Sequence, residues 1–234
     1  MKTSKFIIRA LLWIATIIVT IQTVRKWVAD VCLISSDSMA NTILAGDRIV
    51  VRKIAGNSIQ RNDLIIFNHP DGGGTQLIKR CIGLPGDTIL LHDGDVYINN
   101  NFIATPSTVI MPENDYDLEF PLRDLLWTIN YYGPVIAPKK GLTVTLDSMN
   151  TSLYQHVIQI ETTMENPYTV TSNTNYVFKS NCYFVLGDHR GNSIDSRHWG
   201  FVADDLIVGK AVMVYFSKNK EKNQIRWNRI GKLL

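Results

Sequence analysis

The sequence predicts a mainly β protein, in which an N-terminal transmembrane helix precedes a β-rich domain that is interrupted by an inserted β-rich subdomain with a short helix. Three features lead to this fold class. The chain begins with a long apolar run, continues with short segments rich in β-branched and aromatic residues, and has a proline-rich stretch in its middle.

The apolar run extends from Phe6 to Val24, with Arg9 as its single charged residue. A helix buried in a globular domain normally keeps a polar face, which this run lacks. A cleavable signal peptide needs a small-residue cleavage site, and no good site appears in residues 25–30. We therefore expect a retained transmembrane helix.

Basic residues near the two ends of the run predict its orientation. Lys2, Lys5 and Arg9 outweigh Arg25 and Lys26. Because basic residues favour the cytoplasmic side, the N-terminus is expected inside the cell and the body of the protein outside the cytoplasm.

After this helix, short segments of strand-like composition are closed by Gly, Pro, Asn or Asp, which predicts a β-dominated domain. These segments are Arg48–Lys53, Leu64–Phe67, Gln76–Ile82, Thr88–Leu91, Asp95–Ile98, Cys182–Leu186 and Ala211–Phe216.

The stretch between about residues 102 and 175 is proline-rich and shows no obvious chemistry. Its helical periodicity is limited to Ser152–Thr162, where Leu153, Val157 and Ile160 share a face. We interpret the stretch as an inserted subdomain. The predicted division is an anchor with a cytoplasmic start at 1–29, a main β domain at 30–101 plus 176–234, and the insertion at 102–175.

Composition limits the classes of function. A net charge of +3 without a concentrated basic stripe gives no reason to expect a nucleic-acid partner. Cys32, Cys81 and Cys182 lack the spacing of a zinc or redox motif, so no metal or cofactor is expected. A disulfide between Cys81 and Cys182 stays open, with buried free thiols as the favoured alternative. The sequence does not indicate the oligomeric state.

Two hydroxyl residues, Ser36 and Ser38, follow the apolar run. Serine pairs are common in loops, so alone they indicate little. Lys79 lies inside an otherwise apolar predicted strand, either as an edge charge that deters aggregation or as a desolvated amine with a depressed pKa. In the second case a neutral amine is available to accept a proton.

The segment from Phe184 to Phe201 is dense in polar groups able to pair with one another. Loops of this kind, here bounded by Gly187 and Gly200, are typical of sites held by a rigid scaffold. Its polar residues are Asp188, His189, Arg190, Asn192, Ser193, Asp195, Ser196, Arg197 and His198.

These three segments, in this order after an apolar helix, resemble the boxes of type I signal peptidases (leader peptidases), which are serine endopeptidases. Residues 36–43 resemble the box Ser-x-Ser-Met-x-Pro-Thr-Leu, and residues 79–87 match Lys-Arg-x-x-Gly-x-Pro-Gly-Asp. Residues 187–197 resemble Gly-Asp-Asn-Arg-Asp-Asn-Ser-x-Asp-Ser-Arg. The likeness covers roughly residues 1–100 and 176–232 and leaves the insertion unexplained.

The chain departs from these boxes at three positions. Asn41 stands in place of proline, His189 in place of asparagine and Gly191 in place of aspartate. The missing proline is expected to loosen the turn behind Ser38, and Gly191 to add flexibility beside Asn192.

The resemblance implies a membrane-bound serine endopeptidase that removes N-terminal signal peptides from exported preproteins, after small residues in an Ala-x-Ala pattern. It implies a Ser-Lys dyad, with Ser38 as nucleophile and Lys79 as general base. The Ser38 N–H and the Ser36 hydroxyl form the implied oxyanion hole, and Ser193 orients the lysine. The implied supporting residues are Asp195, Arg197, Asp188 and Arg190.

The implied partners are exported preproteins and the lipid bilayer. The implied location is the bacterial cytoplasmic (inner) membrane, crossed once, with the catalytic domain on the extracytoplasmic side. Three alternatives stay open. A Ser-His-Asp triad is possible in composition, since His189 and His198 lie near Asp188 and Asp195 in the sequence. The second alternative is a Ser-Lys peptidase with a dedicated client. The third is a non-catalytic, membrane-tethered domain that binds signal peptides.

Overall fold

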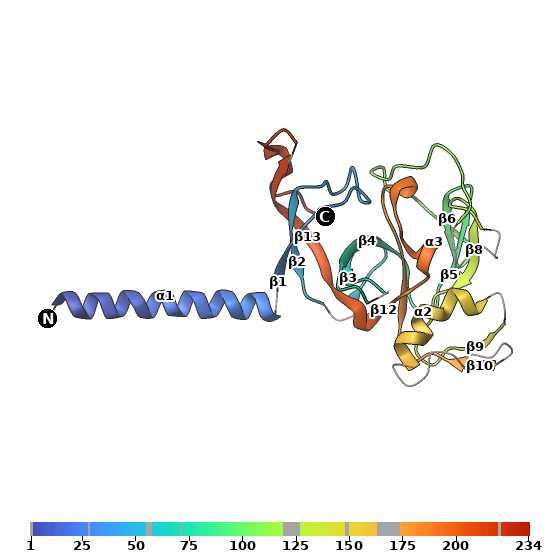
Figure 1. Cartoon of the computed structure of the whole chain (residues 1–234), viewed down its shortest axis with the longest axis horizontal. Coiled ribbons are helices and arrows are strands. Elements are labelled where there is room, and N and C mark those ends of the chain that lie inside the picture. Colours follow the sequence, from blue (N-terminus) through green and yellow to red (C-terminus); the bar gives the residue numbers. More distant parts are fainter. Residues whose placement is uncertain are drawn as a thin grey trace.

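The computed structural model describes residues 2–27, 29–54, 58–70, 72–118, 127–147, 150–162, 174–219 and 221–234. The protein is mainly β, as the sequence predicts. Figure 1 shows a body of sheets from which one long N-terminal helix extends.

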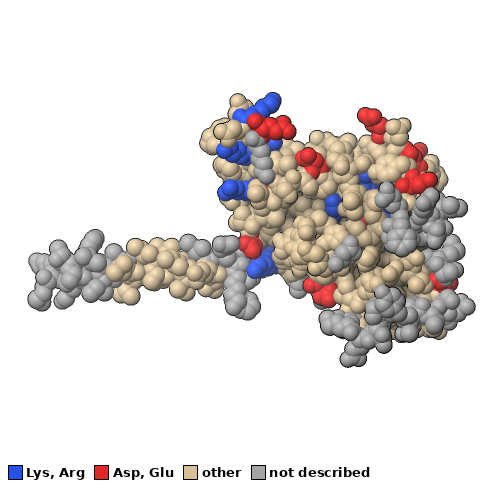
Figure 2. All heavy atoms as spheres, viewed as in Figure 1, with Lys and Arg blue, Asp and Glu red and all other residues tan. Residues whose placement is uncertain are grey.

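The long helix α1 (Lys2–Trp27) includes the predicted anchor Phe6–Val24. Its large apolar side chains between Leu11 and Val19 are 49–70% exposed, and Figure 2 shows no charged group along this stretch. Among the side chains that the structure describes, no helix has the length and hydropathy required to cross a bilayer. The side chains of residues 6–8, 10, 21 and 24 lie outside the described part. The membrane crossing stays a prediction.

The main sheet has eight strands, in the order β1-β2-β13-β3-β4-β11-β12, with β14 paired to β13, and its neighbours are antiparallel. Its strands are β1 (Ala29–Leu33), β2 (Asp47–Arg52), β3 (Leu64–Asn68), β4 (Gln76–Gly83), β11 (Cys182–Leu186), β12 (Val202–Ala203), β13 (Ile207–Asn219) and β14 (Gln224–Ile225). All seven predicted strand segments overlap strands of the structure, five of them in this sheet and two in the sheet described next.

A second sheet has four strands in the order β7-β6-β5-β8, and a third pairs β10 with β9. Their strands are β5 (Thr88–His92), β6 (Asp95–Ile98), β7 (Asn101–Ile103), β8 (Tyr132–Ile136), β9 (Thr143–Leu146) and β10 (Thr174–Val177). The four-stranded sheet takes strands from both sides of residue 102, where the insertion was predicted to begin. The division into domains stays a prediction.

Helix α2 (Asn150–Thr162) confirms the helix predicted at Ser152–Thr162. Tyr154 of α2 stacks on Phe201, and both belong to a core cluster that also holds Phe184 of β11 and Ile89 of β5. The second sheet and α2 therefore share one core with the main sheet. The shorter helices are η3 (Arg190–Asn192), α3 (Ser196–Trp199), η4 (Asp204–Leu206) and η5 (Trp227–Arg229).

Strand β3 is buried on both faces. Leu64 and Ile66 pack into one core cluster, whereas Ile65 and Phe67 pack into another together with Trp199. A strand covered on both sides needs an uninterrupted apolar run, which is the pattern of Leu64–Phe67. Strand β4 lies between β3 and β11 and is likewise buried from Ile78 onward.

The three cysteines are free thiols, so the disulfide left open by the sequence is not formed. Cys81 packs with the cluster of Phe67, whereas Cys182 packs with that of Phe184. Burial raises the pKa of the Cys81 thiol to about 12, so it is a small apolar group with little thiolate character.

Candidate active site

The turn that bears Ser38 connects β1 to β2. Met39 and Ile43, both 0% exposed, fasten the turn to the core, and the Ile43 N–H donates to the Met39 carbonyl over 2.8 Å. Ser38 is half-buried and Ser36 is exposed, with their Oγ atoms 3.4 Å apart. The turn therefore presents both hydroxyls together beside solvent.

Asn41 has a φ of 69°, in the left-handed region. Proline, whose φ is fixed near about −65°, does not fit this conformation, so the departure from the proline box matches a different turn. The end of the turn is tied by other groups. The Thr42 carbonyl accepts hydrogen bonds from Arg229 Nη2 at 3.0 Å and Lys232 Nζ at 3.2 Å.

Lys79 lies in β4, paired with Ile65 of β3, and is 3% exposed. Because β4 is an interior strand, the interpretation of Lys79 as an edge charge is wrong. Burial lowers the pKa of the Lys79 amine from 10.5 to about 8, against the opposing charge of Asp195 and with a smaller contribution from Arg197. Near this pH a large fraction of the amine is neutral.

Ser193 connects Lys79 to the nucleophile turn. Lys79 Nζ donates to Ser193 Oγ over 2.9 Å. A Cβ added to Gly187 would lie 2.5 Å from Ser193 Cβ and 2.7 Å from the Ser38 carbonyl oxygen, so these two serines occupy the space that a side chain at position 187 would need. The His189 N–H also donates to the Ser38 carbonyl, over 3.0 Å.

Lys79 Nζ and Ser38 Oγ are not joined by a direct hydrogen bond in the described part of the chain. Contacts between catalytic groups commonly tighten when a substrate is in place. Lys79 and Ser193 form one hydrogen-bonded pair and Ser36 and Ser38 another, and the His189 N–H joins the loop of Ser193 to the Ser38 carbonyl.

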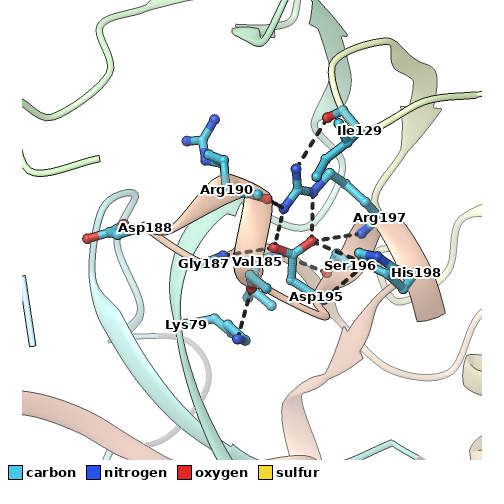
Figure 3. A network of polar contacts seen from close by, with 12 residues as sticks. Lys79, Ile129, Val185, Gly187, Asp188, Arg190, Asp195, Ser196, Arg197 and His198 are labelled. Atoms are coloured by element: carbon cyan, nitrogen blue, oxygen red, sulfur yellow. Dashed lines mark hydrogen bonds and ion pairs between the residues drawn. The ribbon is translucent and has the colours of Figure 1, made fainter. Parts of the chain in front are cut away.

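Asp195 and Arg197 form a buried, bidentate ion pair, with Arg197 Nε 2.9 Å from Oδ1 and Nη2 2.7 Å from Oδ2 of Asp195. Asp195 also accepts the Gly187 N–H at 2.9 Å. Burial favours the neutral acid, but the charge and hydrogen bonds of Arg197 outweigh it and lower the pKa of Asp195 far below its usual range. Figure 3 shows this carboxylate at the centre of the network.

The guanidinium of Arg197 also fixes two further segments. Its Nη1 donates to the Ile129 carbonyl at 3.2 Å and its Nη2 to the Arg190 carbonyl at 2.8 Å. The Asp195–Arg197 pair therefore supports the loop that holds Gly187 and Ser193.

Asp188 and Arg190 point away from the Asp195 carboxylate (Figure 3). Asp188 pairs with Arg80 of β4, whose Nε donates to Oδ1 over 2.7 Å, and it also accepts the hydroxyl of Thr42. Arg190 is 2% exposed, and its Nη1 is 3.5 Å from the Gly94 carbonyl. Asp188 thus joins the lysine strand to the nucleophile turn.

The sequence of this chain matches one family of known proteins over most of its length. A family model described as "Signal peptidase, peptidase S26" matches residues 7–216. The chain belongs to this signal peptidase family. The signal peptidase I of Aquifex aeolicus is 30% identical, over 86% of this chain and 81% of that protein. The signal peptidase I of Buchnera aphidicola from Acyrthosiphon pisum is 28% identical, over 99% of this chain and 83% of that protein. The signal peptidase I of Pseudomonas aeruginosa is 26% identical, over 88% and 72%.

As a member of the S26 family, the protein is a serine endopeptidase. The two histidines that the sequence offered as alternative bases differ in their surroundings. His198 Nδ1 accepts the Asp195 N–H at 3.3 Å, as part of the cap of α3. His189 Nδ1 is buried without a hydrogen-bond partner among the described residues. Among the residues that the structure describes, neither imidazole hydrogen-bonds Ser38. The geometry therefore gives no support to a Ser-His-Asp triad.

Sequence analysis of this signal peptidase missed three residues of the site, namely Thr42, Arg80 and Gly187. All three lie inside the motifs that were recognised, but their partners are distant in the chain. Gly187 matters because a side chain there would collide with Ser193. The sequence did carry a signal for Gly187, because a glycine directly after a buried strand and before a polar loop often marks a place where a side chain does not fit.

Proposed function

We propose that this peptidase removes N-terminal signal peptides from exported preproteins, with Ser38 as the nucleophile and Lys79 as the general base. The observation that supports it most is the setting of the Lys79 amine. It is 3% exposed, has a pKa lowered by burial to about 8, and is held by Ser193, which lies against the same glycine as the Ser38 carbonyl.

In the acylation step, Ser38 Oγ attacks the scissile carbonyl carbon while the neutral Lys79 amine takes the hydroxyl proton. The new C–O bond moves an electron pair onto the carbonyl oxygen. The Ser38 N–H and the Ser36 hydroxyl stabilise this oxyanion. As the C–N bond breaks, the Lys79 ammonium returns the proton to the leaving amine.

In the deacylation step, Lys79 is neutral again and takes a proton from a water molecule that attacks the acyl-enzyme ester. The C–O bond to Ser38 breaks, and the proton returns to Ser38 Oγ. Ser193 orients the amine for both steps. Asp195 with Arg197, and Asp188 with Arg80, hold the backbone from which these groups project, and Arg190 supports the loop from its buried position.

We propose that the substrate lies extended along a strand edge, so that alternate side chains enter pockets. Small pockets favour small residues before the cleaved bond, which corresponds to an Ala-x-Ala pattern.

We also propose that α1 anchors the protein in the bacterial cytoplasmic membrane, with the catalytic domain outside the cytoplasm. The exposed apolar side chains from Leu11 to Val19 support this. The body adds exposed apolar residues on the strand that follows α1, namely Val31 and Leu33 of β1. Figure 2 shows several basic side chains, with an acidic one beside them, on the side of the body from which α1 leaves. Such a surface suits anionic headgroups.

The test is cleavage of a preprotein with an Ala-x-Ala site by the full-length protein in detergent or lipid. Ser38→Ala and Lys79→Met are expected to abolish cleavage, whereas the exposed Ser35→Ala and Lys140→Met serve as matched controls. Equal activity of the wild type and Ser38→Ala would exclude the proposed nucleophile. Binding of the signal peptide without cleavage would instead favour the non-catalytic alternative, and cleavage of one preprotein among many would favour a dedicated client.

A further inference from the structure

A segment of the chain outside the family boxes packs directly on the catalytic loop. We call this segment, residues 106–117, the strap. It leaves the four-stranded sheet after β7 and returns toward β8. Its far end is fixed to the segment that precedes β8, because the Ile129 N–H donates to the Tyr116 carbonyl over 3.0 Å and Asp117 forms an isolated bridge with Thr128. The strap is therefore held at its far end by the segment before β8, and its middle reaches the catalytic loop.

The middle of the strap brackets His189 on both sides. The Ile110 N–H donates to the Asp188 carbonyl over 2.7 Å, and the Ile110 carbonyl accepts the Arg190 N–H over 2.9 Å. His189, between these two bonds, donates its own N–H to the Ser38 carbonyl. The strap thereby fixes the backbone that contacts the nucleophile residue.

The strap and the glycine at position 191 fit each other. A Cβ on Gly191 would lie 3.1 Å from Pro112 Cβ and 3.2 Å from Pro112 Cα, closer than ordinary side-chain contacts. The Tyr116 hydroxyl donates to the Gly191 carbonyl over 3.1 Å. The departure of this chain from an aspartate at position 191 therefore leaves the space that the strap occupies.

Thr108 of the strap reaches the nucleophile turn through Thr42. The Thr42 and Thr108 Oγ1 atoms are 2.8 Å apart, and Thr42 Oγ1 also contacts the Asp188 carboxylate. A hydroxyl has one proton, and an ionised carboxylate accepts but does not donate. Thr42 therefore donates to Asp188, and Thr108 donates to Thr42. This chain of bonds continues from Asp188 to Arg80, next to Lys79.

We propose that Thr108 is a positioning residue for peptide hydrolysis, because it fixes the Thr42 hydroxyl on Asp188 and so holds the Ser38 turn in register with Lys79. The inference rests on the proposed function of Ser38 and Lys79. It assigns to part of the insertion a role in catalysis that the family boxes do not contain.

The test compares Thr108→Val, which keeps the shape but removes the donor, with Thr108→Ser, which keeps the donor. Thr145→Val is the matched control, because it removes a hydroxyl that bonds Asn175 over 2.8 Å in the remote two-stranded sheet. Thr108→Val is expected to lower kcat about fivefold with KM unchanged, which corresponds to the loss of one hydrogen bond. Thr108→Ser and Thr145→Val are expected to keep the wild-type kcat.

The route through Thr42 is tested by a double-mutant cycle. In a Thr42→Val background, the further change Thr108→Val is expected to have no effect on kcat, because the bond to Asp188 is already lost. An undiminished fivefold loss in that background would overturn the proposal. So would a wild-type kcat for Thr108→Val alone.

Hydrogen exchange separates this proposal from the proposed function, because it needs no catalysis. The His189 amide is expected to exchange faster in Thr108→Val than in Thr145→Val, whether or not the protein cleaves preproteins. Unchanged exchange would overturn the positioning role. Equal inactivity of the wild type and Ser38→Ala would instead contradict the dyad.

Discussion

The amine of Lys79 hydrogen-bonds the hydroxyl of Ser193 over 2.9 Å, and both side chains are buried. This contact ties strand β4 to the loop that follows β11. It orients the amine in a setting where burial lowers its pKa to about 8.

The pH dependence of cleavage should report the Lys79 amine. The base works only when it is neutral, so kcat/KM is expected to rise about tenfold per pH unit below about 8 and to level off above it. Initial rates on a peptide substrate from pH 5.5 to 10 give the profile. A rise of kcat/KM centred at about pH 6.5 that disappears in His189→Ala or His198→Ala would point to a histidine base instead.

Stability should depend on pH through the same group. The Lys79 amine has a pKa of about 8 when folded and 10.5 as its ordinary value, so the folded state releases its proton first. Below about pH 8 the folded protein must bury a charge, and raising the pH from 8 to 10.5 relieves this penalty. Lys79→Met is therefore expected to be more stable than the wild type at pH 7, and the difference should shrink by up to ~3 kcal/mol as the pH rises through that window. Urea unfolding of both proteins at several pH values measures it. A difference that stays constant would contradict the buried charge.

A side chain at position 187 should lower activity strongly. Gly187→Ala places a Cβ 2.5 Å from Ser193 Cβ and 2.7 Å from the Ser38 carbonyl oxygen, so both serines must shift. We expect kcat to fall by about 100-fold or more, since a displacement of roughly 1 Å at a catalytic group has an effect of this order. Gly73→Ala is the matched control, because its added Cβ has no neighbour within 4 Å. Similar activity of the two variants would show that Gly187 does not set the spacing of the serines.

Removing the charge of Asp195 should lower the stability of the fold and also shift the pH profile of cleavage. Asp195→Asn leaves the guanidinium of Arg197 buried without its anion, so we expect a loss of about 3–5 kcal/mol in the free energy of unfolding. The charge of Asp195 also raises the pKa of Lys79, so the acid limb of kcat/KM should move to lower pH. Asp95→Asn, at an exposed position of β6, should change stability by less than about 0.5 kcal/mol. An acid limb that moves to higher pH in Asp195→Asn would contradict the assigned electrostatics.

The strands that could be predicted are those with dense β-branched and aromatic residues. Leu64–Phe67 became β3, and Ala211–Phe216 lies within the longer β13. Strand β8 was missed because Gly133 and Pro134 resemble a turn, although the structure places them in a strand. The partners of each strand could not be predicted, because β13 pairs with both β2 and β3, which precede it by most of the chain.

The members of the site could be predicted from the family resemblance, but their support could not. Lys79 hydrogen-bonds Ser193, and the Ser38 carbonyl lies beside Gly187 of the same loop, whereas the roles of these residues stay a proposal. The ion pair of Asp188 with Arg80 depends on how β4 packs beside β11, which local composition does not specify. The contact of Thr108 with Thr42 depends on the path of an insertion that resembles no box.

The most direct test of the account is a titration of the Lys79 amine in the full-length protein. Lysine labelled with ¹³C at Cε allows the side chain to be followed by NMR, and Lys79→Met identifies its signal. We expect a pKa near 8 for this one lysine. A pKa near 10.5 would mean that the amine is charged at neutral pH, and that Lys79 is not poised to accept the proton of Ser38.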